Sequence, residues 1–434
     1  MTTGGHDPAA EVVGICSDLI GIDTSNFGDE PGPGERKAAE HVAQLLDEVG
    51  ISVDVVESEP GRTSLVARWG GDVGEPVLLH GHLDVVPAKA EDWRVHPFSG
   101  EVQDGVVWGR GAVDMKDFDA MLLSTVRARA RVGAVPTRPL VLCFTADEEA
   151  GGAKGAGHLV EAHRDLIGDC TVAVGEVGGF STTIRGRRVY LVEAAEKGMA
   201  WVRLTARGSA GHGSMRHPDN AVTTLAAAVA RIGRHEWPVR LTPTMEVLLA
   251  AVAELAGTEA TPANAEALVE EFGTASRMIG AAIRNSANPT MLAAGYKVNV
   301  VPGTATARVD GRFLPGYEDE FWDTVAALAG PDVEVTRDVH LTGIETTYDG
   351  DVADAMTAAL LAEDPDAVVA PYLMSAGTDA KHWQTLGMRC FGFTPLRLPE
   401  DLDFTALFHG VDERVPVDSL EFGARVFDRF LDLL

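Results

Sequence analysis

Three adjacent carboxylates stand out in the sequence, at Asp147, Glu148 and Glu149. They follow the apolar run 139–146, which is typical of a buried strand, and two glycines come directly after Ala150. Such a cluster is either a solvated turn or a site that holds a cation. The residues near the ends of other apolar runs help to decide between these interpretations.

Further acidic and histidine residues stand near the ends of predicted strands or in loops. They are His82, Asp84, Asp114, Glu176 and His409. In open α/β sheets, ligand sites lie at the carboxyl ends of the strands, so we expect these side chains to converge on one crevice. Imidazole and carboxylate groups suit divalent metals such as zinc, and the lack of cysteine ligands favours a catalytic over a structural site.

The positions within this set predict different tasks. Residues two apart in a strand point the same way, so Asp84 is predicted to lie behind His82 and to accept its second ring N–H. Glu148 and Glu149 are neighbours that point apart on an extended backbone, so we expect them to differ in role. A carboxylate beside the metals but not bound to them can collect a proton and deliver it to a leaving amine. Asp147 is interpreted as a turn residue.

The elements that position these residues alternate in the first half of the chain. Helices are predicted over residues 34–50 and 118–131, and continuous apolar strands over 76–86 and 139–146. Continuous apolar strands separated by helices indicate an α/β sheet that is covered on both faces.

This pattern is interrupted in the middle of the chain and returns near its end. The intervening sequence predicts a small α+β domain, in which residues 238–290 are expected to be helical. We therefore predict a discontinuous catalytic domain, residues 1–197 and 343–434, with an inserted lid domain, residues 198–342.

The composition restricts the class of function. The 434 residues include 65 acidic and 36 basic side chains, which gives a net charge of −29. Phosphate binding needs a basic face, so nucleic acid is not expected as a partner. The four cysteines form no close pair, and we recognise neither a signal peptide nor an apolar run of membrane length. These features predict a cytoplasmic protein without a membrane partner.

Seven motifs, in order along the chain, resemble those of the M20 family of metallopeptidases. They are HGHLDVVP, GRGAVDMK, TADEEAGG, SAGHGSMRHPDNAV, KVNVVPG, SAGTDA and FHGVDER. That family includes carboxypeptidases, dipeptidases, aminoacylases and deacylases of acetylornithine and succinyl-diaminopimelate. The resemblance covers nearly the whole chain and implies a zinc-peptidase α/β domain with an inserted α+β lid of the dimerisation type.

The resemblance also implies ligands for two zinc ions, with cobalt or manganese as alternative metals. The ligands would be Asp114 as the bridge, His82 and Glu176 at one ion, and Glu149 and His409 at the other. Glu148 would be the general base, acting on water held between the ions. Family members commonly have a cis peptide bond after the bridging aspartate, here Asp114–Met115.

The remaining site residues are assigned to the substrate by the same resemblance. His212 would stabilise the tetrahedral oxyanion, and in dimeric members this histidine comes from the neighbouring subunit, so a homodimer through the lid is a candidate assembly. Asn299 and Arg312 match lid positions associated with substrate, and Gly377 and Thr378 match a turn that makes backbone contacts. Arg312 suits a substrate carboxylate, although a salt bridge within the lid is nearly as good an interpretation.

Two features depart from the family's pattern. Asp117 follows Lys116 where the family often has glycine, which predicts an altered local shape. The segment 238–290 is longer than in compact lids, so lid contacts of compact members do not transfer directly. His382 and other isolated histidines are interpreted as surface residues.

Together these features predict a dinuclear zinc hydrolase that cleaves an amide bond next to a free carboxylate. It would act as a peptidase or as a deacylase of N-acyl amino acids. One alternative is a ureido or carbamoyl amidohydrolase that uses the same site. Another is a non-catalytic binding protein on the same scaffold, which predicts a lost ligand or base, and none is lost here.

Overall fold

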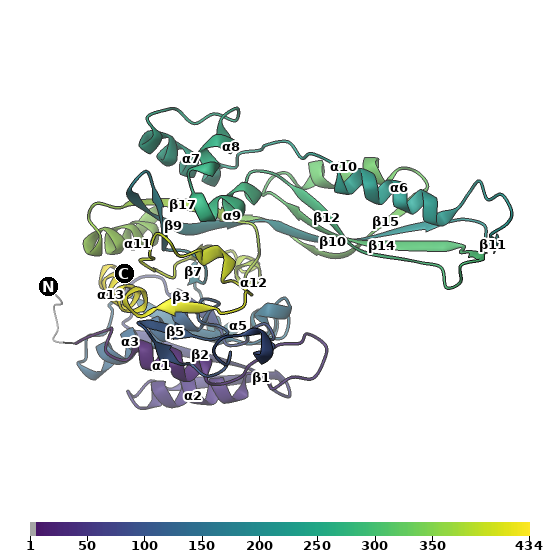
Figure 1. Ribbon diagram of the computed structural model, residues 1–434. Coiled ribbons are helices and arrows are strands. Elements are labelled where there is room, and N and C mark those ends of the chain that lie inside the picture. The colour runs from purple at the N-terminus through teal and green to yellow at the C-terminus, as the bar shows by residue number, and fades with distance from the viewer. Residues whose placement is uncertain (1–5) are drawn as a thin grey trace.

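The main body of the protein is built around a ten-stranded mixed sheet, and the computed structural model describes residues 6–434 (Figure 1). The strands are β1 (Val53–Glu59), β2 (Arg62–Gly70), β3 (Val77–His82), β6 (Pro139–Thr145), β7 (Val172–Gly175), β8 (Phe180–Ile184), β9 (Arg187–Glu196), β16 (Ile344–Glu345), β17 (Val368–Met374) and β18 (Arg389–Gly392). The main path runs β1-β2-β6-β3-β7-β18-β9-β16, and β8 and β17 also pair with β9. Because β3 lies parallel to both β6 and β7, the carboxyl ends of these three strands meet at one edge.

Helices cover both faces of this sheet. They are α1 (Val12–Ile20), α2 (Arg36–Asp47), α3 (Lys116–Arg131), α4 (Ala156–Ala162), α5 (Arg164–Ile167), α11 (Gly350–Glu363), α12 (Ala380–Gln384) and α13 (Val417–Leu433). Val77 and Leu79 of β3 pack in the core with α1, α2, α3 and α13, whereas Leu78 packs in the core with α4 and α12. Burial on both faces therefore explains why the sequence of β3 is continuously apolar.

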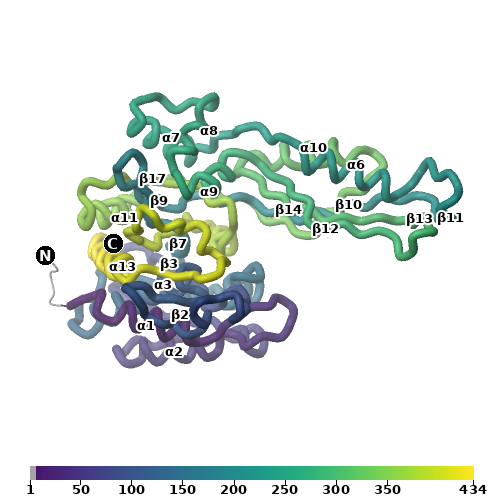
Figure 2. The backbone as a smooth tube through the Cα atoms, in the orientation of Figure 1, coloured from purple at the N-terminus to yellow at the C-terminus, as the bar shows by residue number. Residues whose placement is uncertain are grey.

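A second sheet, antiparallel and four-stranded, extends from the main body as an arm (Figure 1). Its strands, in spatial order, are β12 (Ser286–Ala294), β14 (Thr304–Phe313), β10 (Gly198–Arg207) and β15 (Val333–Leu341). Helices α6 (Ala221–Gly233) and α10 (Glu318–Ala329) share a separate hydrophobic core with this sheet. At the far end of the arm, β11 (Gly211–His212) pairs with β13 (Val300–Val301) (Figure 2).

Three helices between the strands of the arm pack on the main body instead. They are α7 (Pro243–Ala256), α8 (Ala265–Glu270) and α9 (Ser276–Ala281). Leu248, Phe272 and Ile279 belong to the large core of the main body, and α7 and α9 contact β17. These contacts place the three helices with the main body. The predicted division of the chain into a catalytic domain and a lid domain stays a prediction.

The structure confirms the predicted mixed α/β class and corrects some elements. The predicted helical segment 238–290 runs too far, because β12 begins at Ser286 and pairs along β14. After the two glycines the chain forms two short helices, α4 and α5, which are divided at His163. Within residues 6–434, no helix combines the length and the apolar character needed to cross a membrane.

Candidate active site

Two sets of loops meet at the carboxyl edge of β3, β6 and β7. His82 ends β3, Glu148 follows β6, and Glu176 follows β7. The second set consists of the loops that carry Asp114 and His409. A small sheet connects them, formed by β4 (Val102–Gln103), β5 (Val106–Trp108) and β19 (Arg414–Pro416). The pairing of β5 with β19 brings the loop of Asp114 beside the loop of His409, although these residues are far apart in sequence.

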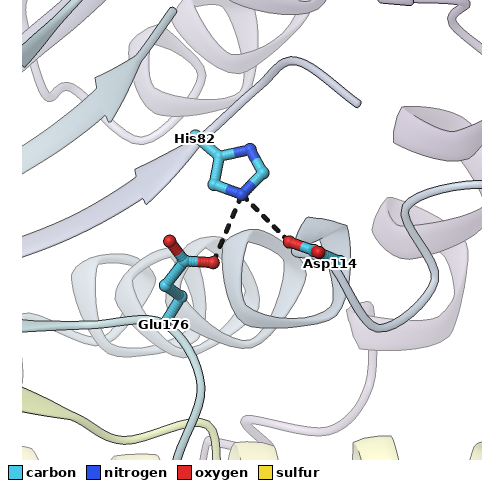
Figure 3. Close-up of side chains that lie close together, drawn as sticks. All are labelled: His82, Asp114 and Glu176. Atoms are coloured by element: carbon cyan, nitrogen blue, oxygen red, sulfur yellow. Dashed lines mark hydrogen bonds and ion pairs between the residues drawn. The ribbon is translucent and has the colours of Figure 1, made fainter. Parts of the chain in front are cut away.

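The first cluster of candidate metal ligands surrounds His82 (Figure 3). Its Nε2 atom lies 3.1 Å from Oδ1 of Asp114 and 3.3 Å from Oε2 of Glu176. Both carboxylates point at the same ring nitrogen, and His82 is buried. These three side chains have ligand atoms within 4.8 Å of one another, so they are able to surround a single cation.

The second cluster shares Asp114 with the first. His409 places Nε2 3.2 Å from Oδ2 of Asp114 and 3.0 Å from Oε2 of Glu149. One oxygen of Asp114 therefore faces each cluster, which is the geometry of a bridging carboxylate. The peptide bond between Asp114 and Met115 is cis, as expected from the resemblance.

The chemistry of these side chains fits divalent cations. Burial raises the pKa of Glu148 well above its ordinary value, with Glu176 as the next cause, and burial raises the pKa of Glu176 to about 8. Several buried carboxylates at such short range are unfavourable when all are charged, and nearby cations remove that cost. The donors are imidazole nitrogens and carboxylate oxygens, the set that zinc takes in catalytic sites. The residues present therefore suit two metal ions.

Asp84 is close to His82, but its role differs in one atom from the prediction. Nδ1 of His82 lies 2.9 Å from the backbone carbonyl oxygen of Asp84 and 3.7 Å from the carboxylate. The carboxylate instead accepts the backbone N–H groups of Glu148 and Glu149, both at 3.1 Å, and the side-chain amide of Asn26 at 2.8 Å. Asp84 therefore accepts the second ring N–H of His82, as predicted, but through its backbone carbonyl, while its carboxylate accepts three other donors.

The turn that carries the two glutamates has a left-handed residue at its start. Asp147 adopts φ +69°, a conformation that aspartate tolerates better than most residues. Its carboxylate accepts the backbone N–H of Lys154 at 2.9 Å and lies 3.7 Å from Nε of Arg62. These contacts agree with the interpretation of Asp147 as a turn residue.

Glu148 lies beside both clusters without belonging to either. Its Oε2 atom is 3.8 Å from Nε2 of His82, and its side chain lines the large cavity next to Asp114. Glu149, one residue later, points to His409. The expected difference in direction between these neighbours is therefore seen in the structure.

A cavity of about 850 Å³ connects this edge of the sheet with the base of the arm. Gly377, Thr378 and Arg312, which the resemblance assigns to the substrate, line it. Thr378 donates its backbone N–H to Glu196 at 3.1 Å, which fixes the turn. Arg312 also pairs with Asp310 of the arm, with 2.9 Å between Nε and Oδ1, which is the salt bridge offered as its second interpretation. Its contact with substrate stays a prediction.

His212 and Asn299 lie outside this cavity. Both stand at the far end of the arm, where β11 pairs with β13 and the N–H of Gly213 bonds to the carbonyl of Asn299 (Figures 1 and 2). His212 is exposed, and its Nδ1 lies 2.7 Å from the hydroxyl of Ser214. Within one chain, these two residues are brought together but not to the metal ligands.

Several residues that line the cavity or hold its lining in place were not identified from the sequence. His382, interpreted as a surface residue, lines the cavity and bonds to the carbonyl of Gly151 at 2.9 Å. Asp379 is buried and bonds to Thr145 at 2.7 Å. Glu196, which holds Thr378, stands at the end of β9, and Glu176 directly follows β7. An acidic residue at the end of an apolar run was therefore a signal in the sequence that could have identified Glu196. Asp117 is buried in the first turn of α3, where its carboxylate accepts the N–H of the next residue.

Comparisons with known proteins show which family the chain belongs to. The sequence is 29% identical over 381 residues to a probable carboxypeptidase S-like protein of Dictyostelium discoideum, covering 82% of this chain and 71% of that one. It is 27% identical over 442 residues to an N-fatty-acyl-amino acid synthase/hydrolase of Xenopus tropicalis, covering 95% and 83%. It is also 27% identical over 414 residues to aminoacylase-1 of Sus scrofa, covering 93% and 91%.

The fold is similar to that of an M20 family metallo-carboxypeptidase from Sulfolobus solfataricus. The TM-score is 0.72 at 17% sequence identity, and the match covers 98% of this chain and 99% of the other. The profile of peptidase family M20/M25/M40 matches residues 78–433, which include every residue of the two ligand clusters. The chain therefore belongs to peptidase family M20/M25/M40, and it is a hydrolase of the peptidase and aminoacylase type.

Proposed function

We propose that this hydrolase uses two zinc ions to cleave the amide bond of N-acyl amino acids whose acyl group is large and apolar. The observation that carries the proposal is the position of Asp114, with one carboxylate oxygen at His82 and the other at His409. The proposed ligands are His82 and Glu176 on one side and Glu149 and His409 on the other. Cobalt and manganese remain candidate substitutes.

The proposed chemistry assigns the proton transfers to Glu148. When bound, two zinc ions would lower the pKa of nearby water and polarise the carbonyl of the substrate. Glu148 would take the proton of the attacking water and deliver it to the leaving amine nitrogen. Burial, which raises the pKa of Glu148, suits a group that must hold a proton between these two steps. Asp84 would keep this glutamate in place through its backbone.

The wall of the cavity supports an apolar acyl group. On the arm, Met199 of β10 lies opposite Leu341 of β15, and Trp201 lies opposite Val339. All four side chains line the cavity, and we call these four residues the apolar wall. Burying an alkyl chain on it contributes roughly 0.8 kcal/mol for each methylene group. The Xenopus relative's printed name includes N-fatty-acyl-amino acids, in agreement with this preference.

The position of His212 supports a homodimer in which the arm completes the active site of a second chain. His212 is too far along the arm to serve its own cavity (Figure 1). Exposed apolar residues accompany it on the arm, namely Met291, Leu292, Tyr296 and Val298. Contiguous exposed apolar surface commonly marks a protein interface. In this arrangement His212 and Asn299 would contact the substrate bound by the partner.

A substrate panel tests the proposed activity. Zinc-loaded protein is offered N-decanoyl leucine, N-acetyl leucine, leucyl-leucine and N-carbamoyl leucine, and the released leucine is measured. The proposal predicts the highest kcat/KM for N-decanoyl leucine, loss of activity with a chelator, and recovery on addition of zinc or cobalt. Preference for the dipeptide or the carbamoyl compound would contradict the proposed substrate, and activity that survives chelation would contradict the metal mechanism.

A further inference from the structure

Residues 238–290, the segment that is longer than in compact lids, supply one side of the cavity. Thr274, in the 3₁₀ turn Gly273–Ala275 that leads into α9, and Arg277, Met278 and Ala281 of α9 line the cavity. Their spacing of three, four and seven residues puts them on one face of a helix. The segment therefore has a local task at the cavity beyond its packing against β17.

Both ends of this helical face are fixed to parts of the active site. The buried Nζ atom of Lys197 donates to the carbonyl oxygens of Ala281 at 3.0 Å and Arg284 at 2.7 Å. Lys197 lies between β9 and β10, where the chain passes from the main body to the arm. At the other end, the hydroxyl of Thr405 donates to the carbonyl of Thr274 at 3.4 Å, and Thr405 is four residues before His409. Arg277 is thus carried by a helix with a defined place at the cavity.

Arg277 differs from the other lysine and arginine side chains of this cavity. Arg312 is paired with Asp310, and Lys381 is paired with Glu196 at 2.8 Å. Within residues 6–434, Arg277 has no ion pair and no side-chain hydrogen bond, and it is exposed to the cavity. Its five N–H donors are free, and a guanidinium group binds a carboxylate through two parallel hydrogen bonds.

We propose that Arg277 is a specificity residue that binds the free carboxylate of the substrate. This inference rests on the proposed function, because it names the group that distinguishes an N-acyl amino acid from a simple amide. The apolar wall and Arg277 then recognise opposite ends of the substrate: the wall contacts the acyl chain and Arg277 contacts the acid. The amide bond between these ends lies beside the metal ligands.

Binding measurements test the assignment without relying on turnover. Zinc-loaded Glu148→Gln protein, which is expected to hold substrate without cleaving it, is titrated calorimetrically with N-decanoyl leucine and with N-decanoyl leucinamide. Adding Arg277→Ala is expected to weaken binding of the acid by about ten- to a hundredfold and binding of the amide by less than about twofold, since the lost contact is a hydrogen bond to a charged group. Arg277→Lys keeps the positive charge but cannot form two parallel hydrogen bonds to a carboxylate, so it is expected to weaken binding of the acid by an intermediate amount.

A matched control is Arg185→Ala. Arg185 is exposed and pairs with Glu271 of the same segment, but it does not line the cavity. Its removal is expected to leave both affinities unchanged, which separates a local contact from a general loss of positive charge.

The outcomes separate this inference from the proposed activity. If Arg277→Ala leaves the affinity for the acid unchanged, or weakens acid and amide equally, the assignment is wrong. It is also wrong if the acid-specific loss appears only in Arg312→Ala. If the wild type cleaves none of the panel but the acid-specific loss at Arg277 is found, the proposed activity fails and the carboxylate site stands. A protein that binds neither compound contradicts both.

Discussion

The carboxylate of Asp84 accepts a hydrogen bond from the backbone N–H of Glu148 at 3.1 Å. A second oxygen of the same carboxylate accepts the N–H of Glu149 at the same distance, so one buried side chain fixes the start of the turn that carries both glutamates. The backbone carbonyl of Asp84 also bonds to His82. Asp84 therefore connects the end of β3 to the turn after β6 and sets the positions of three candidate active-site residues.

Replacing Asp84 with asparagine tests this positioning role. The new amide group would present hydrogens to one of the two backbone N–H groups, which leaves a buried donor without a partner. We expect the free energy of unfolding to fall by about 1–3 kcal/mol. We expect kcat to fall at least tenfold, which corresponds to an activation barrier higher by roughly 1.4 kcal/mol. Urea unfolding and steady-state kinetics measure both. Asp54→Asn, at an exposed position of β1, is the control, and an Asp84→Asn protein that matches it in both measurements would refute the role.

Replacing Glu148 with glutamine tests the proposed general base. Glutamine keeps the size of the side chain but cannot accept the proton, so kcat is expected to fall by about 10²- to 10⁴-fold. The metal content is expected to stay unchanged, because Glu148 belongs to neither ligand cluster. Metal analysis and kinetics on the same preparation separate the two effects. Glu161→Gln, at an exposed position of α4, is the control. Normal hydrolysis by a fully metal-loaded Glu148→Gln protein would exclude the assignment.

Mixing two inactive variants tests whether His212 acts on a second chain. His212→Ala keeps its own Glu148, and Glu148→Gln keeps its own His212, so a mixed dimer contains one complete site. After unfolding and refolding of an equal mixture, random pairing is expected to restore about a quarter of wild-type activity. Each variant refolded alone serves as the control. A mixture that stays as inactive as its components would mean that His212 does not complete a partner's site.

The stability of the protein is expected to depend on pH through Lys197. Burial, and then the charge of Arg312, lower the pKa of Lys197 from 10.5 to about 7. Between these values the unfolded chain binds more protons than the folded chain, so the contribution of Lys197 to stability rises with pH. The free energy of unfolding of the wild type minus that of Lys197→Met is therefore expected to increase from pH 7 to about 9. A difference that is constant or decreases over this range would contradict the lowered pKa.

The sequence predicted the ligand clusters because parallel strands impose a common edge. His82 and Glu176 stand at strand ends, so their convergence follows from the order of the elements. The sequence did not show that Asp84 would contact His82 through its backbone carbonyl. That choice of atom depends on the N–H groups of the turn after β6, which bond to the carboxylate of Asp84. Arg277 was invisible for a similar reason: its place at the cavity depends on α9 packing against β17, and those elements are distant in sequence.

The position of His212 marks another limit of prediction from one sequence. Its motif identified the residue, but only the structure places it at the far end of the arm, away from the cavity (Figure 2). The extent of the arm depends on how β12 pairs with β14, and the predicted helical segment 238–290 wrongly includes the start of β12. Local patterns therefore predicted the main body better than the arm.

The central claim is that Asp114 bridges two metal ions, and anomalous diffraction from crystals of the zinc-loaded protein tests it most directly. Data collected above the zinc absorption edge locate each ion. The account predicts two peaks per chain on either side of the Asp114 carboxylate, one also contacting His82 and Glu176 and the other contacting Glu149 and His409. A single peak, or two peaks that do not share Asp114, would contradict it.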